Sequence, residues 1–231
     1  MAATFRGFPN DFFAFFRELK AHNERSWFEA NKQRFRESVQ APMSEFIAAM
    51  APKLAKISKR FTVDPRPNGG SMFRIYRDVR FSRDKRPYKE HAACHFRHSL
   101  GKDVHAPGFY MHFAPGEVFF GGGLWMPPPD ALAKIREAIA SKPAAWKKVL
   151  EQKNFRDTFR TVQGEALTRP PRGFDPAHPF IDDIRKKSFF AMREADQKLA
   201  ASPALVDEVA GGFAAVSPLM KFLCAAVDVP Y

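Results

Sequence analysis

Apolar residues in the first 60 positions recur with the period of an α-helix. Phe12, Phe15, Phe16 and Leu19 stand at i, i+3, i+4 and i+7, which predicts an amphipathic helix from Asn10 to about His22. A second helix, capped by Asn23, has Trp27, Phe28 and Phe35 on one side. The period continues through Met43, Phe46, Ile47, Met50, Leu54 and Ile57. Pro52 within this third segment predicts a kink or an early end. Residues 9–60 are therefore predicted to be helical.

After a loop over 61–71 the period changes from that of a helix to that of a strand. Apolar and polar residues alternate over 73–81, 92–97 and 109–113, and an apolar run at 118–120 leads into the glycines at 121–123, so four strands are predicted. The turns between them are short, which indicates an antiparallel sheet. Phe73, Ile75, Phe81 and Cys94 fall on the core side of these strands. Arg77 interrupts the apolar side of the first strand, which predicts either a buried ion pair with an acidic residue or a bulge.

Helical periodicity returns over 127–141, 143–152 and 203–227, and the mixed region 155–195 has room for one short added strand. No internal repeat or low-complexity linker divides the chain. The prediction is a single α+β domain over 1–231, with a helical part at 9–60, a sheet core at 72–124 and a helical and mixed part at 127–231. The antiparallel sheet has about four to six strands. Helices from the N-terminal third and the C-terminus pack on one of its faces.

The composition is that of a globular protein, with 45% hydrophobic and 27% charged residues in 231. Cys94 and Cys224 are far apart and in no metal-type or CxxC spacing, so reduced thiols in a cytoplasmic protein are expected. The N-terminal residues do not have the pattern of a signal peptide. No run approaches the ~20 apolar residues of a membrane span. We therefore expect a cytoplasmic location and no membrane partner.

Charge points to an anionic partner. The chain has 37 Lys and Arg against 25 Asp and Glu, and residues 74–89 have seven against two. This excess is typical of proteins that bind nucleic acid, acidic membranes or phosphorylated or carboxylated small molecules, and also of soluble proteins that are merely basic. Charge alone does not separate these alternatives.

One face of the predicted sheet collects polar side chains of unusual type. They are Arg74, Tyr76, Asp78, Arg80, His91, His95, Arg97, Tyr110 and His112, with Lys85, Tyr88 and Lys89 at the rim and Trp125 as a partial lid. Arginine is the preferred partner of carboxylate and phosphate, and His and Tyr also bind oxyanions.

From this face we predict a small-anion site, and an enzyme that acts on such a compound is one form it could take. Arg74, Arg80 and Arg97 would clamp the anion. The acid–base candidates are His95, His112 and Asp78, and Tyr110 or Tyr76 would donate a hydrogen bond. In the structural alternative, Asp78 and Asp84 pair with neighbouring arginines while helices or loops cover the face.

Other chemistries have weaker signals. His91 and His95 are four residues apart, but no compact metal motif accompanies them, and no metal or cofactor is predicted. Alternation turns Cys94 away from His95, which favours a buried thiol over a nucleophile. Gly121–Gly123 lacks the pattern of a phosphate-binding loop. The rival functional prediction is a single-strand nucleic-acid module that uses the same basic surface, although no RNP1-like run, KH loop or helix-turn-helix pattern is present.

Several motifs together are similar to one known family. They are the stretch from Phe73 to Lys89, Asn23–Phe28 followed by Asn31-Lys32, Gly121–Trp125, Asp175–Pro179 and Pro218–Leu223. These resemble the signature of an uncharacterised family catalogued as domain of unknown function 2461, and the resemblance runs from about Phe8 to Tyr231. It implies one full-length domain and no particular reaction.

Overall fold

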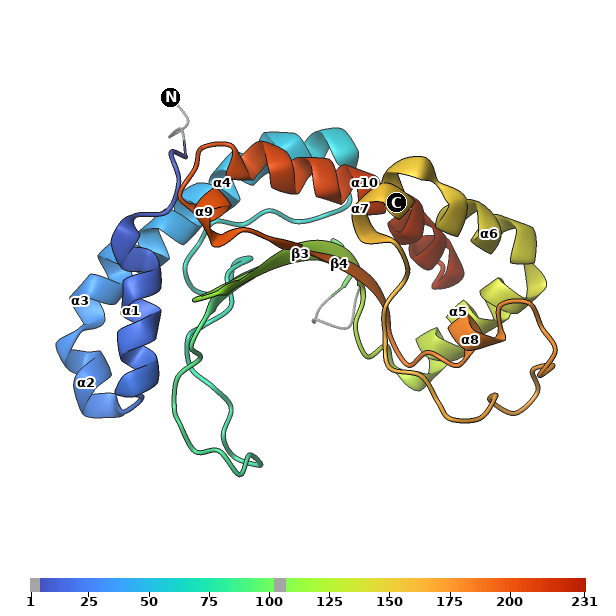
Figure 1. Cartoon of the computed structure of the whole chain (residues 1–231), viewed down its shortest axis with the longest axis horizontal. Coiled ribbons are helices and arrows are strands. Elements are labelled where there is room, and N and C mark those ends of the chain that lie inside the picture. Colours follow the sequence, from blue (N-terminus) through green and yellow to red (C-terminus); the bar gives the residue numbers. More distant parts are fainter. Residues whose placement is uncertain (1–4, 102–106) are drawn as a thin grey trace.

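Four antiparallel strands form one open sheet in the order in which they occur along the chain. A computed structural model describes residues 5–101 and 107–231 (Figure 1). The strands are β1 (Ala92–Arg97), β2 (Gly108–Ala114), β3 (Glu117–Leu124) and β4 (Phe189–Ala195). The α+β class and the antiparallel sheet are confirmed, and the strand number lies within the predicted range. The short strand expected in the mixed region is β4.

The N-terminal helices follow the predicted periodicity closely. They are α1 (Asn10–Ala21), α2 (Arg25–Ala30), α3 (Lys32–Phe35), the π-helix η1 (Arg36–Gln40) and α4 (Ala41–Ile57). The early end expected at Pro52 is wrong, because α4 continues through that residue to Ile57. The π-helix was not predicted, since a shift from i+4 to i+5 hydrogen bonds leaves no clear mark in the apolar pattern.

The C-terminal part supplies the remaining helices. They are α5 (Pro129–Ser141), α6 (Pro143–Glu151), α7 (Lys153–Phe159), α8 (Ile181–Ile184), α9 (Gln197–Ala200) and α10 (Leu205–Ala226). The predicted helices over 127–141, 143–152 and 203–227 correspond to α5, α6 and α10. The turns α8 and α9 are too short to show a helical period.

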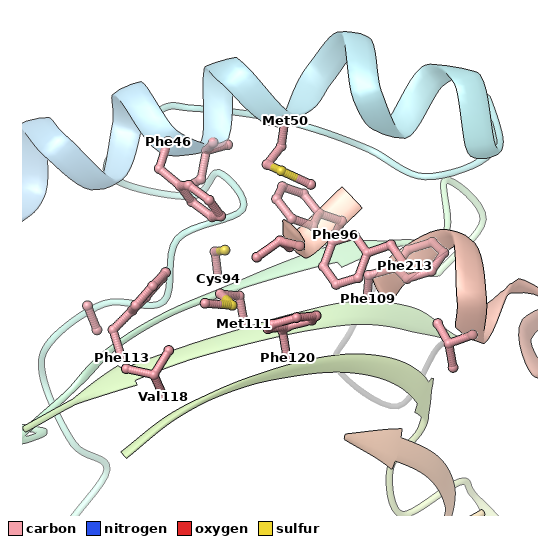
Figure 2. Packing of buried hydrophobic residues seen from close by; sticks show 14 of the residues in the cluster. Phe46, Met50, Cys94, Phe96, Phe109, Met111, Phe113, Val118, Phe120 and Phe213 are labelled. Atoms are coloured by element: carbon pink, nitrogen blue, oxygen red, sulfur yellow. The ribbon is translucent and has the colours of Figure 1, made fainter. Parts of the chain in front are cut away.

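The core lies between one face of the sheet and helices α4 and α10, which cross over it (Figure 1). Figure 2 shows Phe46 and Met50 of α4 above Cys94 and Met111 of the strands. Gly212 allows α10 to approach β3, because a Cβ at this position would lie 2.3 Å from the ring of Phe120. Cys94 is fully buried, as alternation predicted.

The other face of the sheet is concave and is not covered by a helix layer (Figure 1). Helices α1–α3 lie beyond one end of this face and α5, α6 and α8 beyond the other. The segment of residues 73–91, the basic arm, runs away from the sheet and back to the start of β1, and these two halves are its legs. It lies below the concave face (teal in Figure 1).

The strand predicted over 73–81 is wrong. Over residues 72–81 the chain forms only isolated bridges, Met72 with Cys94 and Tyr76 with Tyr88, and it bends at Ile75, Arg80 and Phe81. The two legs of the basic arm bond to each other, through the amide of Arg77 to the carbonyl of Pro87 and the amide of Lys89 to that of Ile75. Alternation in the sequence therefore does not by itself show that a segment joins a sheet.

Helix α10 is, of the described helices, the one long and apolar enough to cross a membrane by length and composition. Sequence analysis expected no such run, and in this respect it was wrong. Half of the relevant window is buried in the fold, where α10 packs on β3 and α4. A core helix meets the same criterion.

Candidate functional site

A pocket of about 650 Å³ opens on the concave face of the sheet. Its lining combines rings with a few polar groups: Phe73, His95, Gly108, Tyr110, Glu117, Phe119, Gly123, Trp125, Gln163, Phe190, Met192 and Glu194. All four strands, the basic arm and the segment before α8 contribute to it. This volume lies within the ~300–1,000 Å³ of typical small-molecule sites.

Glycine shapes the floor of the pocket. A Cβ on Gly108 would lie 2.2 Å from Nε2 of His95, so the absence of a side chain lets the imidazole of His95 lie across β2. On β3, residues 119, 121 and 123 share the pocket side, and only Phe119 of these has a side chain. A Cβ at Gly121 or Gly123 would also lie within 2.3 Å of a carbonyl oxygen of β4, so glycine lets the two strands approach here.

Tyr110 and His112 form a hydrogen-bonded pair on β2. The hydroxyl of Tyr110 is 3.1 Å from Nδ1 of His112, whose Nε2 is 3.9 Å from a carboxylate oxygen of Glu117. The ring of Phe119 stacks on His112 at 4.5 Å, and the ring of His91 lies 4.3 Å away on another side. The imidazole of His112 is therefore held in one orientation by packing and by its hydroxyl partner.

His95 is nearly buried beside this pair. Its ring stacks on Phe73 of the basic arm at a centroid distance of 6.2 Å. Within the described part of the chain, its Nδ1 has no hydrogen-bond partner. A buried polar nitrogen without a partner costs stability, and such groups in a pocket wall often have a functional reason.

Burial makes these groups neutral. It lowers the pKa of His91, His95 and His112 to about 4. The neighbouring His112 lowers the pKa of His91 further, and the charge of Arg97 does the same for His95. Burial also raises the pKa of Tyr110 well above its usual range. At neutral pH the site therefore presents neutral imidazoles and a protonated phenol.

The predicted arginine clamp is not assembled in this pocket. Arg80 lies on the exposed part of the basic arm, and its guanidinium pairs with Asp78 at 2.7 Å. Hydrogen bonds from Arg80 lower the pKa of Asp78 to about 2, so this predicted acid–base candidate is a fixed carboxylate away from the pocket. Arg74 and Arg97 do not line the pocket either. The prediction of one shared face failed for Arg74, Tyr76, Asp78 and Arg80 because the segment that holds them is not a strand.

Residues predicted at the rim have mainly structural contacts. Tyr88 is buried against Phe28 at 4.2 Å, and its backbone exchanges hydrogen bonds with the side chain of Asn23. The ammonium groups of Lys85 and Lys89 donate to the carbonyls of Val79 and Arg74 within the basic arm.

Two phenylalanines predicted for the core lie elsewhere. Phe73 lines the pocket, and Phe81 is 94% exposed at the far end of the basic arm. Arg77 pairs with Asp84 at 2.7 Å, so it forms an ion pair with an acidic residue, but this pair is partly exposed and not buried as predicted. Asp78 and Asp84 both pair with neighbouring arginines, as the structural alternative stated.

The family comparison agrees with the resemblance seen in the motifs. A family model described as "Conserved hypothetical protein (DUF2461)" matches residues 11–222. The chain belongs to this family. No curated protein and no solved structure matches it.

Four of the site candidates predicted from the sequence of this DUF2461 chain belong to the pocket or touch it. His95, Tyr110 and Trp125 line the pocket. His112 is hydrogen-bonded to Tyr110. Trp125 lies at the edge, half exposed, with its ring 5.4 Å from that of Phe190. Sequence reasoning missed Glu117, Phe119, Gln163, Phe190, Met192 and Glu194. Alternation on β3 could have found Phe119, whereas the residues of β4 enter the site only through its pairing with β3.

Among the described residues of the DUF2461 chain, no group of three or more His, Cys, Asp and Glu is placed to hold a metal ion. His91 and His112 are close to each other, but within the described ranges no third ligand converges on them. The groups that the described residues of the pocket offer a ligand are therefore hydrogen-bonding and apolar side chains.

Proposed function

We propose that this DUF2461 chain binds a small organic molecule in the concave-face pocket. The observation that supports this most directly is a cavity of about 650 Å³ lined mainly by rings, with a few polar groups directed into it. Pockets with this balance of apolar lining and sparse polar groups are the usual form of small-molecule sites.

The lining suggests the chemistry of the ligand. Phe73, Phe119 and Phe190 offer ring faces and edges to a flat or aliphatic body. Tyr110 offers a hydroxyl, and Glu117 and Glu194 are the charged residues among the described lining. A group bound beside these carboxylates is best neutral or cationic, because a second anion would be repelled. Anion binding by this chain is therefore a separate proposal, for a different part of the surface.

An enzymatic role is the second candidate, and the hydrogen bond between Tyr110 and His112 is the observation that favours it. The neutral imidazole can accept the phenol proton as Tyr110 takes a proton from the ligand, so Tyr110 acts as the base and His112 holds the proton until it is returned. Glu117 lies 3.9 Å from the other ring nitrogen of His112 and would stabilise an imidazolium formed in that exchange. Such a site could catalyse a proton transfer on the bound molecule.

Ligand-observed NMR with a library of small aromatic and aliphatic fragments tests the binding proposal. Met192→Trp should fill the pocket and abolish binding, and Tyr110→Phe should weaken fragments that have a hydrogen-bonding group by about tenfold, the loss of one good hydrogen bond. Phe81→Ala, on the exposed basic arm, is the control and should bind as the original chain does. Fragments that bind the Met192→Trp variant unchanged would show that the pocket is not the site.

The enzymatic candidate needs a further measurement on any fragment class that binds. Exchange of a carbon-bound hydrogen with deuterated solvent, followed by NMR, reports proton transfer without knowledge of the natural substrate. We expect exchange to slow by about 10²–10⁴-fold in Tyr110→Phe and His112→Asn, the usual effect of losing an acid–base group. Equal exchange rates in these variants and in the original chain would exclude the pair as the catalyst.

A further inference from the structure

A second cavity lies between the N-terminal helices and the first leg of the basic arm. Its volume is about 280 Å³. The N-terminal wall includes Lys32, Arg36 and Gln40, and the opposite wall includes Asn68, Arg74 and Tyr76. Phe73 lines this cavity as well as the concave-face pocket, so the two spaces adjoin across one ring.

The charge of this cavity has one sign. Among the described residues that line it there are three cations, Lys32, Arg36 and Arg74, and no Asp or Glu. Lys32 pairs with Glu29, which is outside the lining. Arg36 and Arg74, unlike Arg77, Arg80 and Arg86 of the basic arm, form no ion pair with a described carboxylate. Two guanidinium groups on facing walls are therefore left with their donors available.

The π-helix η1 brings the N-terminal cations together. Lys32, Arg36 and Gln40 are spaced by four residues. In an α-helix such a row drifts by about 40° per step around the axis. The π-turn from Arg36 to Gln40 is wider than an α-turn, so these four residues turn through less than a full circle. This opposite rotation offsets the drift between Lys32 and Arg36. All three side chains line the same cavity as a result, and single π-turns occur often at functional sites.

The remaining walls suit a bound oxyanion. Gln40, Asn68 and Tyr76 add uncharged groups that can donate hydrogen bonds, and Phe28, Phe35 and Phe73 supply apolar wall. Arg36 and Arg74 are exposed, so an ion can reach them from solvent and accept charge-assisted hydrogen bonds, which are stronger than neutral ones. Planar guanidinium groups match carboxylate and phosphate in geometry.

We propose that the cavity between η1 and the basic arm is an oxyanion site, in which Arg36 and Arg74 hold a phosphate or carboxylate group from opposite sides. Tyr76 and Lys32 complete its rim. The site is distinct from the concave-face pocket and does not require that pocket to be occupied. The anionic group belongs either to a small phosphorylated or carboxylated molecule or to the backbone of a nucleic acid.

Calorimetric titration of the full chain with pyrophosphate at low ionic strength tests this site. We expect saturable binding that weakens by about tenfold or more in Arg36→Gln and in Arg74→Gln, since each loses a charge-assisted hydrogen bond. Arg83→Gln is the matched control, because Arg83 is an exposed arginine of the same arm, forms no ion pair with a described residue and lines neither cavity. Arg36→Lys and Arg74→Lys keep the charge and should retain part of the affinity.

Two results would overturn the proposal: no saturable binding by the original chain, or an equal loss of affinity in Arg83→Gln. Thermal unfolding of each variant without ligand shows that a lost affinity is not a lost fold. This proposal and that of the concave-face pocket can fail independently. Met192→Trp should abolish fragment binding in the pocket, but it leaves Arg36 and Arg74 in place and should still bind pyrophosphate.

Competition identifies the source of the anion. Glycerol phosphate and succinate represent small molecules, and a short single-stranded oligonucleotide without a terminal phosphate represents nucleic acid. Displacement of pyrophosphate by the small compounds assigns the site to a small phosphorylated or carboxylated ligand. Displacement by the oligonucleotide from the original chain, together with weaker direct binding of the oligonucleotide by Arg36→Gln, assigns it to a nucleic-acid backbone.

Discussion

At the scale of single residues, the members of the concave-face pocket could be predicted only where alternation in the sequence corresponds to a true strand. His95 and Tyr110 are opposite each other in the register of β1 and β2, and His112 follows two residues on. Their shared face is therefore a consequence of strand periodicity and could be predicted. Arg74 and Arg80 obey the same alternation in the sequence, but the segment that holds them is not a strand of the sheet, and its two legs bond to each other. Residue patterns give the direction of a side chain only once the partner of its segment is known.

The neutral histidines lead to a prediction about pH. Burial gives His91, His95 and His112 a pKa of about 4, whereas an unfolded histidine has about 6.5. Between these pH values the unfolded chain binds more protons than the folded chain, so stability should fall as pH decreases from about 6.5 to about 4. Chemical denaturation at about pH 7 and about pH 5, above and within this window, measures the loss.

His112→Phe tests how much of that loss comes from the pocket. Phenylalanine keeps a ring between His91 and Phe119 but takes up no proton, so the stability difference between neutral and mildly acidic pH should become smaller. Part of the effect remains because His95 and His91 still titrate, and Glu117 and Tyr110 keep their places around the site. His22→Phe, an exposed histidine outside the pocket, serves as control. An unchanged pH dependence in His112→Phe would contradict the assignment.

At the scale of elements, the helices and the three hairpin-like strands could be predicted because each has its own period. β2 and β3 are joined by a tight turn at Pro115-Gly116, and their register follows from it. β4 is 65 residues further along the chain (124 to 189) and pairs with β3 through contacts that no local pattern encodes. Phe190, Met192 and Glu194 were missed for this reason. The basic arm was misassigned because its fold depends on docking Tyr88 against Phe28.

Helix α10 has two adjacent glycines that should respond in opposite ways to the same substitution. A Cβ on Gly211 would meet nothing within 4 Å, whereas a Cβ on Gly212 would lie 2.3 Å from the ring of Phe120. Gly211→Ala should stabilise the protein by about 0.4–1 kcal/mol, because alanine lowers the entropy of the unfolded chain. Gly212→Ala gains the same entropy but forces α10 away from β3, with a net loss of about 1–3 kcal/mol.

Denaturant unfolding of these two variants measures both effects against the original chain. Position in the helix and change in composition are the same for both, so each serves as the control for the other. Destabilisation of equal size in both would mean that close packing of α10 on β3 is not what requires glycine at position 212.

At the scale of the whole molecule, the net charge of +12 overstates the charge available to a partner. In the basic arm, Arg77 and Arg86 share Asp84, Arg86 also reaches Glu90, and Arg80 holds Asp78. These pairs leave Arg83 and Lys85 as the cations near the exposed Phe81 that have no carboxylate partner among the described residues. The end of the arm thus offers one stacking ring and two cations without a carboxylate partner, far fewer than the seven cations counted along 74–89.

Because few cations at the end of the arm are unpaired, the nucleic-acid alternative predicts a weak and measurable dependence of affinity on salt concentration. If the end of the basic arm binds single-stranded nucleic acid through Arg83 and Lys85, two phosphate contacts predict a slope of log affinity against log salt concentration of about −1.4, at about 0.7 per contact. Fluorescence anisotropy with a labelled oligothymidine, from about 20 to about 200 mM salt, measures this slope.

Phe81→Ala should weaken binding by about 1–3 kcal/mol through lost stacking. Arg83→Gln should lower the slope by about half while leaving pyrophosphate binding intact. A steeper slope of about −3.5, from five contacts, would instead mean that Arg77, Arg80 and Arg86 release Asp78 and Asp84 to meet the strand. No binding at the lowest salt concentration would remove the nucleic-acid alternative altogether.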